Sequence, residues 1–492
     1  MGDVRQAYLL RTSALASIFL AGIHTSATAQ AENESTAAPV PVENLQSSDG
    51  QSPAPSQVDE ETRLGQVIVT ARRRDESIQE VPVAITAFSG SEVRDQNIGA
   101  PTDLMAKVPS LQVTSQGPTS NTAVYVIRGL GQSFGGSAPS VVTYYADVPT
   151  PVTGYGFFYD LANIQVLKGP QGTLFGRNTT GGAILVSPQK PTNDFGGYAT
   201  ATVGSYSLGR FEGAVNLPLV TDRLAARVAV DVNRRNGYTQ DVLAGIDLDD
   251  RNYSSGRLSL LFTPTDRFEN YLVADYLDIN DHGGSSVLTS VRPGGIVAAV
   301  YPQIFDVLSE QQARGPRKVT LSLDSYFDRV RTEGVINTTT LTLKNIVSHR
   351  TYRIQVTRDG DGSILPIVDY LAYPGVNQTG SSTVPSGTQV TEELQLQGTS
   401  LGGTLDWIVG GYYEDFDADD GSQDRYQLLG GNYTYVVSHR NDSSQALFSQ
   451  ATLDLAWLIE GLSFTAGARY TEDSRSLTEI AAGQPTNVPP TV

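Results

Sequence analysis

The sequence predicts an exported chain in which a mixed α/β unit precedes a membrane β-barrel of many strands. Apolar and polar residues alternate through the second half of the chain, as in strands with one apolar face. The predicted strands recur about every 20 to 30 residues, with alternately short and long polar connections, as in outer-membrane barrels. The N-terminus has the three-part layout of a secretory signal, which fits a product that leaves the cytoplasm.

Residues 1–29 form the predicted signal peptide. Arg5 and Arg11 precede an apolar core over 14–23, and the A-T-A sequence at 27–29 supplies small residues for cleavage. A membrane anchor is the alternative, but an apolar run of about ten residues is too short to span a bilayer. No later run approaches the ~18 apolar residues of a transmembrane helix, so any membrane crossing is expected to use strands.

Charge and composition exclude several classes of function. The chain has 34 Lys+Arg against 52 Asp+Glu, a net charge of -18, which disfavours a nucleic-acid partner. It has no cysteine, so disulfides, thiolate metal sites and a cysteine nucleophile are excluded. No nucleophile, base and orienting group occur at a diagnostic spacing, so no enzyme and no cofactor are expected. The four histidines lie too far apart for a metal site: His24, His282, His349 and His439.

A polar arm leads to one short β-favouring run. Residues 30–63 are rich in Ala, Pro, Ser, Gln and Glu and contain no aromatic residue, so this periplasmic arm is expected to be disordered. The run at 67–70 follows, with no partner strand nearby in sequence. It either joins a local sheet or is a strand offered to another protein by β-augmentation.

Residues 81–192 predict a compact α/β unit. The expected elements are a strand at 82–90, helical segments over 90–109, and strands at 110–116, 123–131, 140–149, 163–169 and 182–188. After residue 195 helical patterning is almost absent, and period-two alternation takes over.

The alternation is strict in the strand LAARVAVDV at 224–232. Its apolar face is formed by Leu224, Ala226, Val228, Val230 and Val232. The opposite face carries Arg227 and Asp231. A soluble sandwich would also alternate, with apolar faces meeting in a dry core, so periodicity alone does not separate the two folds. The aromatic set, 23 Tyr against 15 Phe and 2 Trp, suits the interfacial girdles of a membrane barrel.

Five glycines occur within the fourteen residues from Gly169 to Gly182. The run lacks the Lys-Ser/Thr end of a phosphate loop and closes onto a strand, whereas a dinucleotide loop opens a helix. Leu174 and Phe175 within it argue against a flexible linker. Tight turns packed in a confined space are therefore expected. The turn glycines are Gly129, Gly169, Gly172, Gly176, Gly181 and Gly182.

Several ordered motifs resemble the plug domain of TonB-dependent outer-membrane receptors. They are QVIVTARRRDESIQEVPVAITAFSG at 66–90, IRGLG at 127–131, TYYADVP at 143–149 and LKGPQGTLFGRNTTGGAILVSPQKPT at 167–192. VTEELQLQG at 390–398 and LSFTAGARYTED at 462–473 resemble barrel strands of that family. The resemblance implies an α+β plug domain at 75–192 that fills the lumen of a transmembrane β-barrel of about 22 strands.

The same resemblance assigns further parts. The TonB box region would span 64–74, with Val67, Ile68, Val69, Thr70 and Ala71 as the strand that pairs with TonB. TonB would act with its inner-membrane ExbB/ExbD motor. Because the arm between the predicted cleavage site and the box is short and lacks a folded pattern, a signalling domain and a sigma-regulator partner are not expected.

Plug domains of this family are held by arginines that face barrel glutamates. Arg128 matches one such arginine, and Lys168 stands where the family usually has the second. Lys keeps the charge but lacks the bidentate fork of Arg. Glu393 is the expected barrel partner, because its alternation with Leu394 and Leu396 places it on the lumen face.

The part from 195 to 492 predicts about ten of about 22 strands, so we expect a partial barrel and a fragment of a longer product. The family implies a location in the outer membrane of a Gram-negative bacterium, in contact with its lipid and assembled by its barrel-assembly machinery. The expected function is energy-coupled uptake of a scarce ligand, with ferric siderophores first and glycans, cobalamin or other nutrients as alternatives. A non-transporting barrel remnant is the other class, and the sequence identifies no ligand-binding residues.

Overall fold

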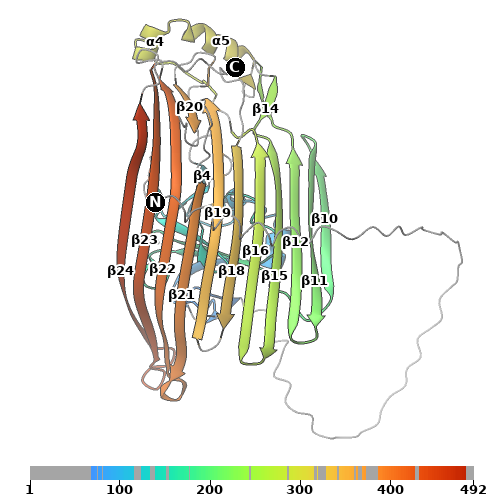
Figure 1. Ribbon diagram of the computed structural model, residues 1–492, viewed down its shortest axis with the longest axis vertical. Helices are drawn as coiled ribbons and strands as arrows, with labels where there is room; N and C mark the ends of the chain where they lie inside the picture. The colour runs from blue at the N-terminus through green and yellow to red at the C-terminus, as the bar shows by residue number, and fades with distance from the viewer. Residues whose placement is uncertain are drawn as a thin grey trace, which may run out of the picture. The chain divides into compact units, whose positions relative to one another are not determined.

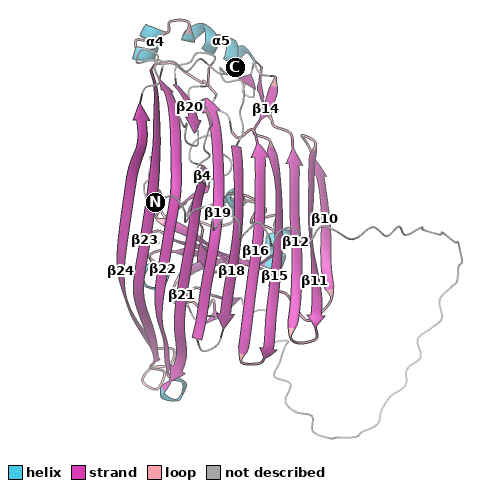
Figure 2. Ribbon diagram, in the orientation of Figure 1, coloured by secondary structure: helices cyan, strands magenta, loops and turns pink. Residues whose placement is uncertain are grey.

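The structure is a computed structural model, and it describes residues 68–483 apart from short gaps. The gaps are 75, 80, 116–122, 133–138, 151–153, 177, 243–244, 285–286, 315–317, 320–327, 341–342, 360–361, 364–367, 373–385 and 427–431. All described residues belong to one unit that begins at Thr62. Strands make up most of it, and a few short helices accompany them (Figure 2).

Long antiparallel strands form a curved wall (Figure 1). In the described part of the chain the sheet has 12 strands, ordered from β10 to β24, with the short β20 (Val368–Ala372) between β19 and β22. The long strands are β10 (Gly196–Gly204), β11 (Leu208–Val220), β12 (Leu224–Arg235), β15 (Arg251–Thr265), β16 (Phe268–Asp281), β18 (Asp328–Thr340), β19 (Leu343–Asp359), β21 (Ser386–Ser400), β22 (Leu405–Tyr426), β23 (Asn432–Asp454) and β24 (Ser463–Gly483). There are eleven of them, one more than the sequence predicted.

Strand β12 shows where the two faces of the wall point. Arg227 faces inward, and its Nε donates to Asp160 at 2.8 Å. Asp231, on the same face, accepts from Arg210 at 2.8 Å. Val228, on the opposite face, is exposed on the outside. A dry-cored sandwich would bury the apolar face, so the wall has the arrangement of a membrane barrel, as predicted.

Connections differ between the two ends of the wall. At one end tight turns at 221–223 and 266–267 and the 3-10 helix η3 (Leu401–Gly403) join neighbouring strands. At the other end longer connections carry most of the small elements (Figure 1). These are β13 (Thr239–Asp241), β14 (Ile246–Leu248), β17 (Lys318–Val319), α4 (Ile296–Val300) and α5 (Ile304–Arg314). None of the helices in the described ranges has the length and apolar character needed to cross a bilayer.

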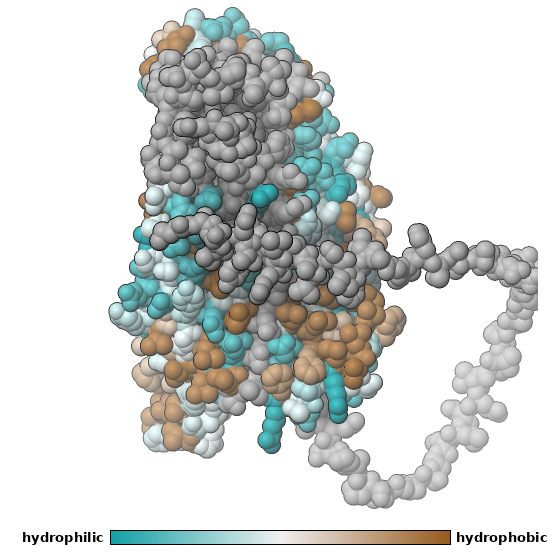
Figure 3. Space-filling view, in the orientation of Figure 1, coloured by the Kyte–Doolittle hydropathy of each residue, from teal (hydrophilic) through white to brown (hydrophobic). Residues whose placement is uncertain are grey.

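Hydrophobic side chains on the face shown in Figure 3 gather toward the end with the tight turns, and polar side chains prevail toward the long connections. Strands β21 to β24 show the same division in their outward rows. Leu394, Leu447 and Tyr470 lie in one row, and Glu392 and Glu472 lie in the next row toward the long connections. The outer surface is therefore apolar over one part of its height only.

Residues 68–192, the plug unit, lie inside the curve of the wall (Figure 1). The central sheet has the order β3-β8-β9-β6-β7, and β6 pairs with β9 in parallel. From β3 onward, the helices and strands of the plug unit are β3 (Ala84–Ser89), α2 (Gly90–Asp95), η2 (Pro101–Ala106), β4 (Leu111–Ser115), β5 (Ala123–Ile127), β6 (Val141–Tyr145), β7 (Val148–Pro149), β8 (Leu161–Lys168), α3 (Gly172–Phe175) and β9 (Gly182–Pro188). Each strand and helix expected over 82–188 is present.

Local chemistry sets the start of helix α2. Ser89 is in an extended conformation, and its hydroxyl accepts from the backbone N–H of Glu92. The Glu92 carboxylate in turn accepts from the backbone N–H of Ser89 at 2.8 Å. This capping box satisfies two of the N–H groups that a helix start leaves free.

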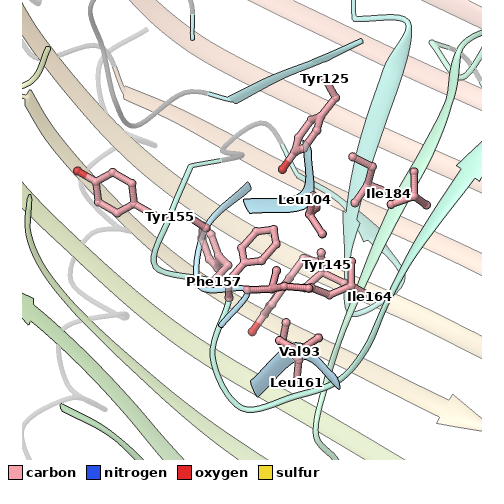
Figure 4. Packing of buried hydrophobic residues seen from close by; sticks show 14 of the residues in the cluster. Val93, Leu104, Tyr125, Tyr145, Tyr155, Phe157, Leu161, Ile164 and Ile184 are labelled. Atoms are coloured by element: carbon pink, nitrogen blue, oxygen red, sulfur yellow. The ribbon is translucent and has the colours of Figure 1, made fainter. Parts of the chain in front are cut away.

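The core of the plug unit joins the wall without a break. Leu104, Tyr145, Ile164 and Ile184 converge in its centre, with Tyr155 at the margin (Figure 4). Inward-facing wall residues belong to the same buried cluster: Tyr253, Tyr271, Val273, Leu277, Ile279 and Ile346. The plug unit and the wall therefore share apolar burial as well as polar contacts.

Candidate functional site

The described part of the expected TonB box packs against the central sheet of the plug unit. Strand β1 (Ile68–Val69) pairs with β2 (Glu76–Ser77), so the idea of a strand with no partner nearby is wrong. The Val69 side chain is fully buried in a cluster with plug residues. The backbone N–H of Thr70 donates to Gln165 Oε1 at 3.0 Å, and Gln165 Nε2 donates to the Thr70 hydroxyl at 3.2 Å.

The pairing of β1 with β2 closes a six-residue connection, which sequence periodicity cannot reveal because the two strands have only two residues each. Ala71, the last residue of the expected box, is also buried. Val67, its first residue, lies outside the described residues.

Three consecutive arginines follow the box, and each contacts a different wall strand. Arg72 Nη1 donates to the Thr452 hydroxyl of β23 at 3.1 Å. Arg73 Nη2 lies 3.0 Å from Glu393 Oε2 of β21. Arg74 Nη2 lies 3.3 Å from Asp406 Oδ2 of β22. These three arginines and their three wall partners are called the arginine clasp below.

Arg73 is the buried centre of the clasp. It is 4% exposed, and so is Glu393. The other oxygen of Glu393 accepts from Gln395 Nε2. Gln397 Nε2 donates to Gln395 Oε1 at 2.6 Å and to the Arg73 carbonyl at 3.2 Å. Alternate residues of β21 thus face inward and form a polar row. This row hydrogen-bonds both the Glu393 carboxylate and the backbone carbonyl of Arg73.

A second acidic residue, Asp147, also contacts Arg73. Arg73 Nη1 donates to the Asp147 carbonyl at 3.1 Å, and Lys344 Nζ of β19 donates to Asp147 Oδ2 at 2.8 Å. Burial opposes ionisation of Asp147, but the charges of Lys344 and Arg73 outweigh burial and lower its pKa to about 2. The ionised Asp147 therefore stabilises the fold above about pH 4 and loses this effect as the pH falls through about 2.

Two aromatic rings cover the Arg73 guanidinium. Its Cζ lies 4.5 Å from the ring centre of Phe175 and 5.3 Å from that of Tyr144. The two rings meet edge to face at 5.0 Å, and the Tyr144 hydroxyl donates to the Phe175 carbonyl. Cation–π contact strengthens when the cation is desolvated, as it is here.

The structure corrects the predicted pairing of the lock. Glu393 does face the lumen, but Arg73 forms its ion pair, in place of Arg128 or Lys168. Arg128 is exposed at a turn with φ of 52°. Lys168 ends β8 near Arg128, and partial burial together with the Arg128 charge lowers its pKa. Motif position alone therefore misassigned the partner of Glu393. The run of three arginines was the available sequence signal.

The glycines mostly serve the expected turns. Positive φ values occur at Gly129, Gly169, Gly176 and Gly182. At Gly182 a Cβ atom would lie 2.2 Å from the Leu167 carbonyl oxygen, so the two strands approach too closely for a side chain. Gly181 has no such φ, but a Cβ there would lie 3.1 Å from backbone oxygens. The predicted turn is wrong for Gly172, because this residue begins α3, and a Cβ atom there would meet nothing within 4 Å.

A cavity of about 270 Å³ lies between the plug unit and strands β21 to β24. Tyr144 and Phe175 line it, so the two rings that cover Arg73 also bound the cavity. The polar and aromatic side chains of its wall side are Gln389, Tyr412, Glu414, Phe416, Arg440, Asp442, Ser444 and Arg469. Over the described ranges, no three His, Cys, Asp or Glu side chains are grouped to hold a metal ion.

Residues 77–183 match the family model of the TonB-dependent receptor plug domain. The chain thus contains a plug domain of the TonB-dependent receptor family, and its wall has the fold of the barrels that hold such plugs. The pesticin receptor of Yersinia pestis is 26% identical to it over 214 residues, which are 43% of this chain and 31% of the relative. The ferric-pyoverdine 358 receptor of Pseudomonas putida is 27% identical over 192 residues, 37% of this chain and 23% of the relative.

Solved TonB-dependent receptors share the fold at low sequence identity. The ferric yersiniabactin uptake receptor FyuA from Yersinia pestis has a TM-score of 0.62 at 18% identity and aligns over 80% of this chain and 61% of its own. The ferripyoverdine receptor of Pseudomonas aeruginosa has a TM-score of 0.58 at 15% identity, over 85% of this chain and 55% of its own. The chain therefore spans less than two thirds of the length of these relatives.

Proposed function

We propose that this protein is an outer-membrane receptor that takes up a scarce ligand of the ferric siderophore class, with energy delivered by TonB. The arginine clasp is the observation that carries the proposal. The short strand β1, with which TonB would pair, is followed directly by the arginine side chains that join the plug unit to three wall strands. Force applied to that strand would reach the contacts between plug and wall first.

The partner strand is suited to capture by β-augmentation. It is extended, only two residues of it are paired, and it lies at the end of a long polar arm. TonB with its ExbB/ExbD motor is the proposed partner. The barrel-assembly machinery, outer-membrane lipid and a cleaved signal peptide at 1–29 belong to the same proposal.

The relatives support the ligand class. The names of several of them refer to ferric complexes or haem: ferric yersiniabactin, ferric pyoverdine and hemin. One is a vitamin B12 transporter. A ferric siderophore is therefore the first ligand class to test.

The test is uptake of iron by cells that carry the chain as their receptor. ⁵⁵Fe would be supplied as ferric yersiniabactin or ferric pyoverdine, with and without a protonophore. Ile68→Pro removes a backbone N–H and bends the strand that TonB would pair with, so uptake should fall to the protonophore-treated level. Ile68→Val keeps the strand and serves as the control.

Energy-dependent uptake that survives Ile68→Pro would overturn the proposed coupling. Uptake of neither ferric complex would overturn the ligand class. Binding of the purified chain to the periplasmic domain of TonB separates the two, because it needs no ligand and should be lost in Ile68→Pro alone.

A further inference from the structure

We infer that the cavity between the plug unit and strands β21 to β24 takes an uncharged, donor-bearing ligand group in preference to a polyanion. The inference rests on the proposed uptake function and specifies the ligand for the cavity described above. An uncharged ferric trihydroxamate and a sugar ring share the required chemistry. A trianionic ferric tricatecholate does not.

The charges along the described cavity lining cancel. The plug side contributes Tyr, Gln, Thr, Phe and Asn side chains and no charged group. The wall side contributes Arg440 and Arg469 against Glu414 and Asp442. An excess of cationic side chains, which a polyanionic ligand needs for steering and for binding, is absent from this lining.

The two arginines are also engaged by the protein itself. Arg440 Nε donates to Asp442 Oδ2 at 3.0 Å, and the guanidinium lies 5.3 Å from the ring centre of Phe416. Arg469 Nε donates to the Thr471 hydroxyl at 3.0 Å, and its guanidinium lies between the rings of Tyr412 and Phe448, 5.6 and 5.4 Å from their centres. A polyanion would have to compete with these contacts.

One residue of the cavity lining, Gln389, has a buried acceptor without a partner. Gln389 is 3% exposed, and its Nε2 donates to Glu414 Oε1 at 2.9 Å. That orientation leaves Gln389 Oε1 buried with no hydrogen-bond partner in the described part of the chain. A buried acceptor without a partner is unfavourable, so a ligand O–H or N–H that donates to Gln389 Oε1 would add a favourable hydrogen bond. Iron-bound catecholate and hydroxamate oxygens both offer acceptors only, so the donor has to be an amide N–H or a hydroxyl elsewhere on the ligand, and the net charge separates the two ligand classes.

Glu414 adds repulsion at the same point. Its second oxygen accepts from the Tyr412 hydroxyl at 3.1 Å, so both carboxylate oxygens accept hydrogen bonds from side chains of the wall. Tyr144 and Phe175 line the same cavity as this carboxylate. Aromatic faces with planar polar groups suit an uncharged ring or chelate.

Equilibrium binding to the purified full chain tests the inference. The probes are ferrichrome, an uncharged ferric trihydroxamate, ferric enterobactin, a trianionic ferric tricatecholate, and maltose, an uncharged sugar. Ferrichrome or maltose should bind about tenfold or more tightly than ferric enterobactin. Equal or tighter binding of ferric enterobactin, or binding of no probe, would overturn the inference. Binding of maltose alone would keep it and reject a siderophore as the ligand.

Glu414→Gln provides a second measurement. Removing the carboxylate charge while keeping the shape should raise the affinity for ferric enterobactin by about tenfold and change that for ferrichrome much less. Glu472→Gln is the matched control, since this carboxylate is exposed on the outer face of β24 and should alter neither affinity. Equal effects of the two substitutions would contradict the assignment of Glu414.

Discussion

At the scale of single residues, the pair of Arg73 and Glu393 links the plug unit to the wall inside a nearly dry space. Removing one partner of a buried ion pair leaves the other charge desolvated, which costs several kcal/mol. Arg73 keeps the Asp147 carbonyl as an acceptor, so the loss should lie at the lower end of that range.

We therefore expect Glu393→Ala to lower the free energy of unfolding by about 3 kcal/mol. Urea titration followed by tryptophan fluorescence would measure it. Glu392→Ala is the control, because the neighbouring side chain is exposed on the outer face. A similar loss in both variants would show that the ion pair does not hold the two parts together.

Two glycines of the run from Gly169 to Gly182 give a second prediction at the scale of single residues. Gly182→Ala would place a Cβ 2.2 Å from the Leu167 carbonyl oxygen at a φ of 149°, and should destabilise the protein by about 2 kcal/mol or more. Gly172→Ala meets no atom within 4 Å and begins a helix, so it should be neutral or slightly stabilising. Equal thermal stabilities would refute this reading of the run.

Sequence reasoning at this scale found the carboxylate and missed its partner. Alternation along β21 is enough to place Glu393 in the lumen, because inward and outward residues follow from backbone geometry. Which cation reaches it depends on the β1–β2 turn, which brings Arg73 beneath β21. No periodic pattern encodes a turn between strands of two residues.

At the scale of elements, the docked box must leave the plug before a partner strand can pair with it. Gln165 holds it through two hydrogen bonds to Thr70. Each such bond contributes about 1 kcal/mol. Elements of the plug core were predicted because their apolar runs are long, whereas the hydrogen bonds to Thr70 come from one polar side chain 95 residues away.

Gln165→Leu should therefore loosen the box without unfolding the plug. The amide of Thr70 should exchange its hydrogen about tenfold faster or more, since one to two hydrogen bonds are lost. Affinity for the periplasmic domain of TonB should rise together with the exchange rate. Gln112→Leu, an exposed glutamine on β4, is the control. Unchanged exchange at Thr70 would mean that other contacts hold the box.

At the scale of the whole molecule, the apolar outer face of the wall indicates which environment surrounds the protein. Val228, Leu258 and Ala274 form one outward row across three strands. The sequence showed that two faces exist, and it could not show which face met a dry core. That depended on the charged plug contacts of Arg227, formed by residues far apart in the chain.

Val228→Lys should destabilise the protein in lipid vesicles by about 2 to 4 kcal/mol, the effect of a lysine near the bilayer midplane. Asn280→Lys, exposed toward the long connections, should change stability much less. Urea titrations in vesicles would compare the two. Comparable values would mean that Val228 does not face the hydrocarbon.

Tyr144 and Phe175 take part in two sites at once, because both rings line the cavity and both contact the Arg73 guanidinium. Withdrawal of Arg73 from Glu393 would leave both rings without the cation beneath them. The cavity lining and the attachment of the expected TonB box would then be lost together. A ligand held against those rings would be released toward the side from which the pull comes.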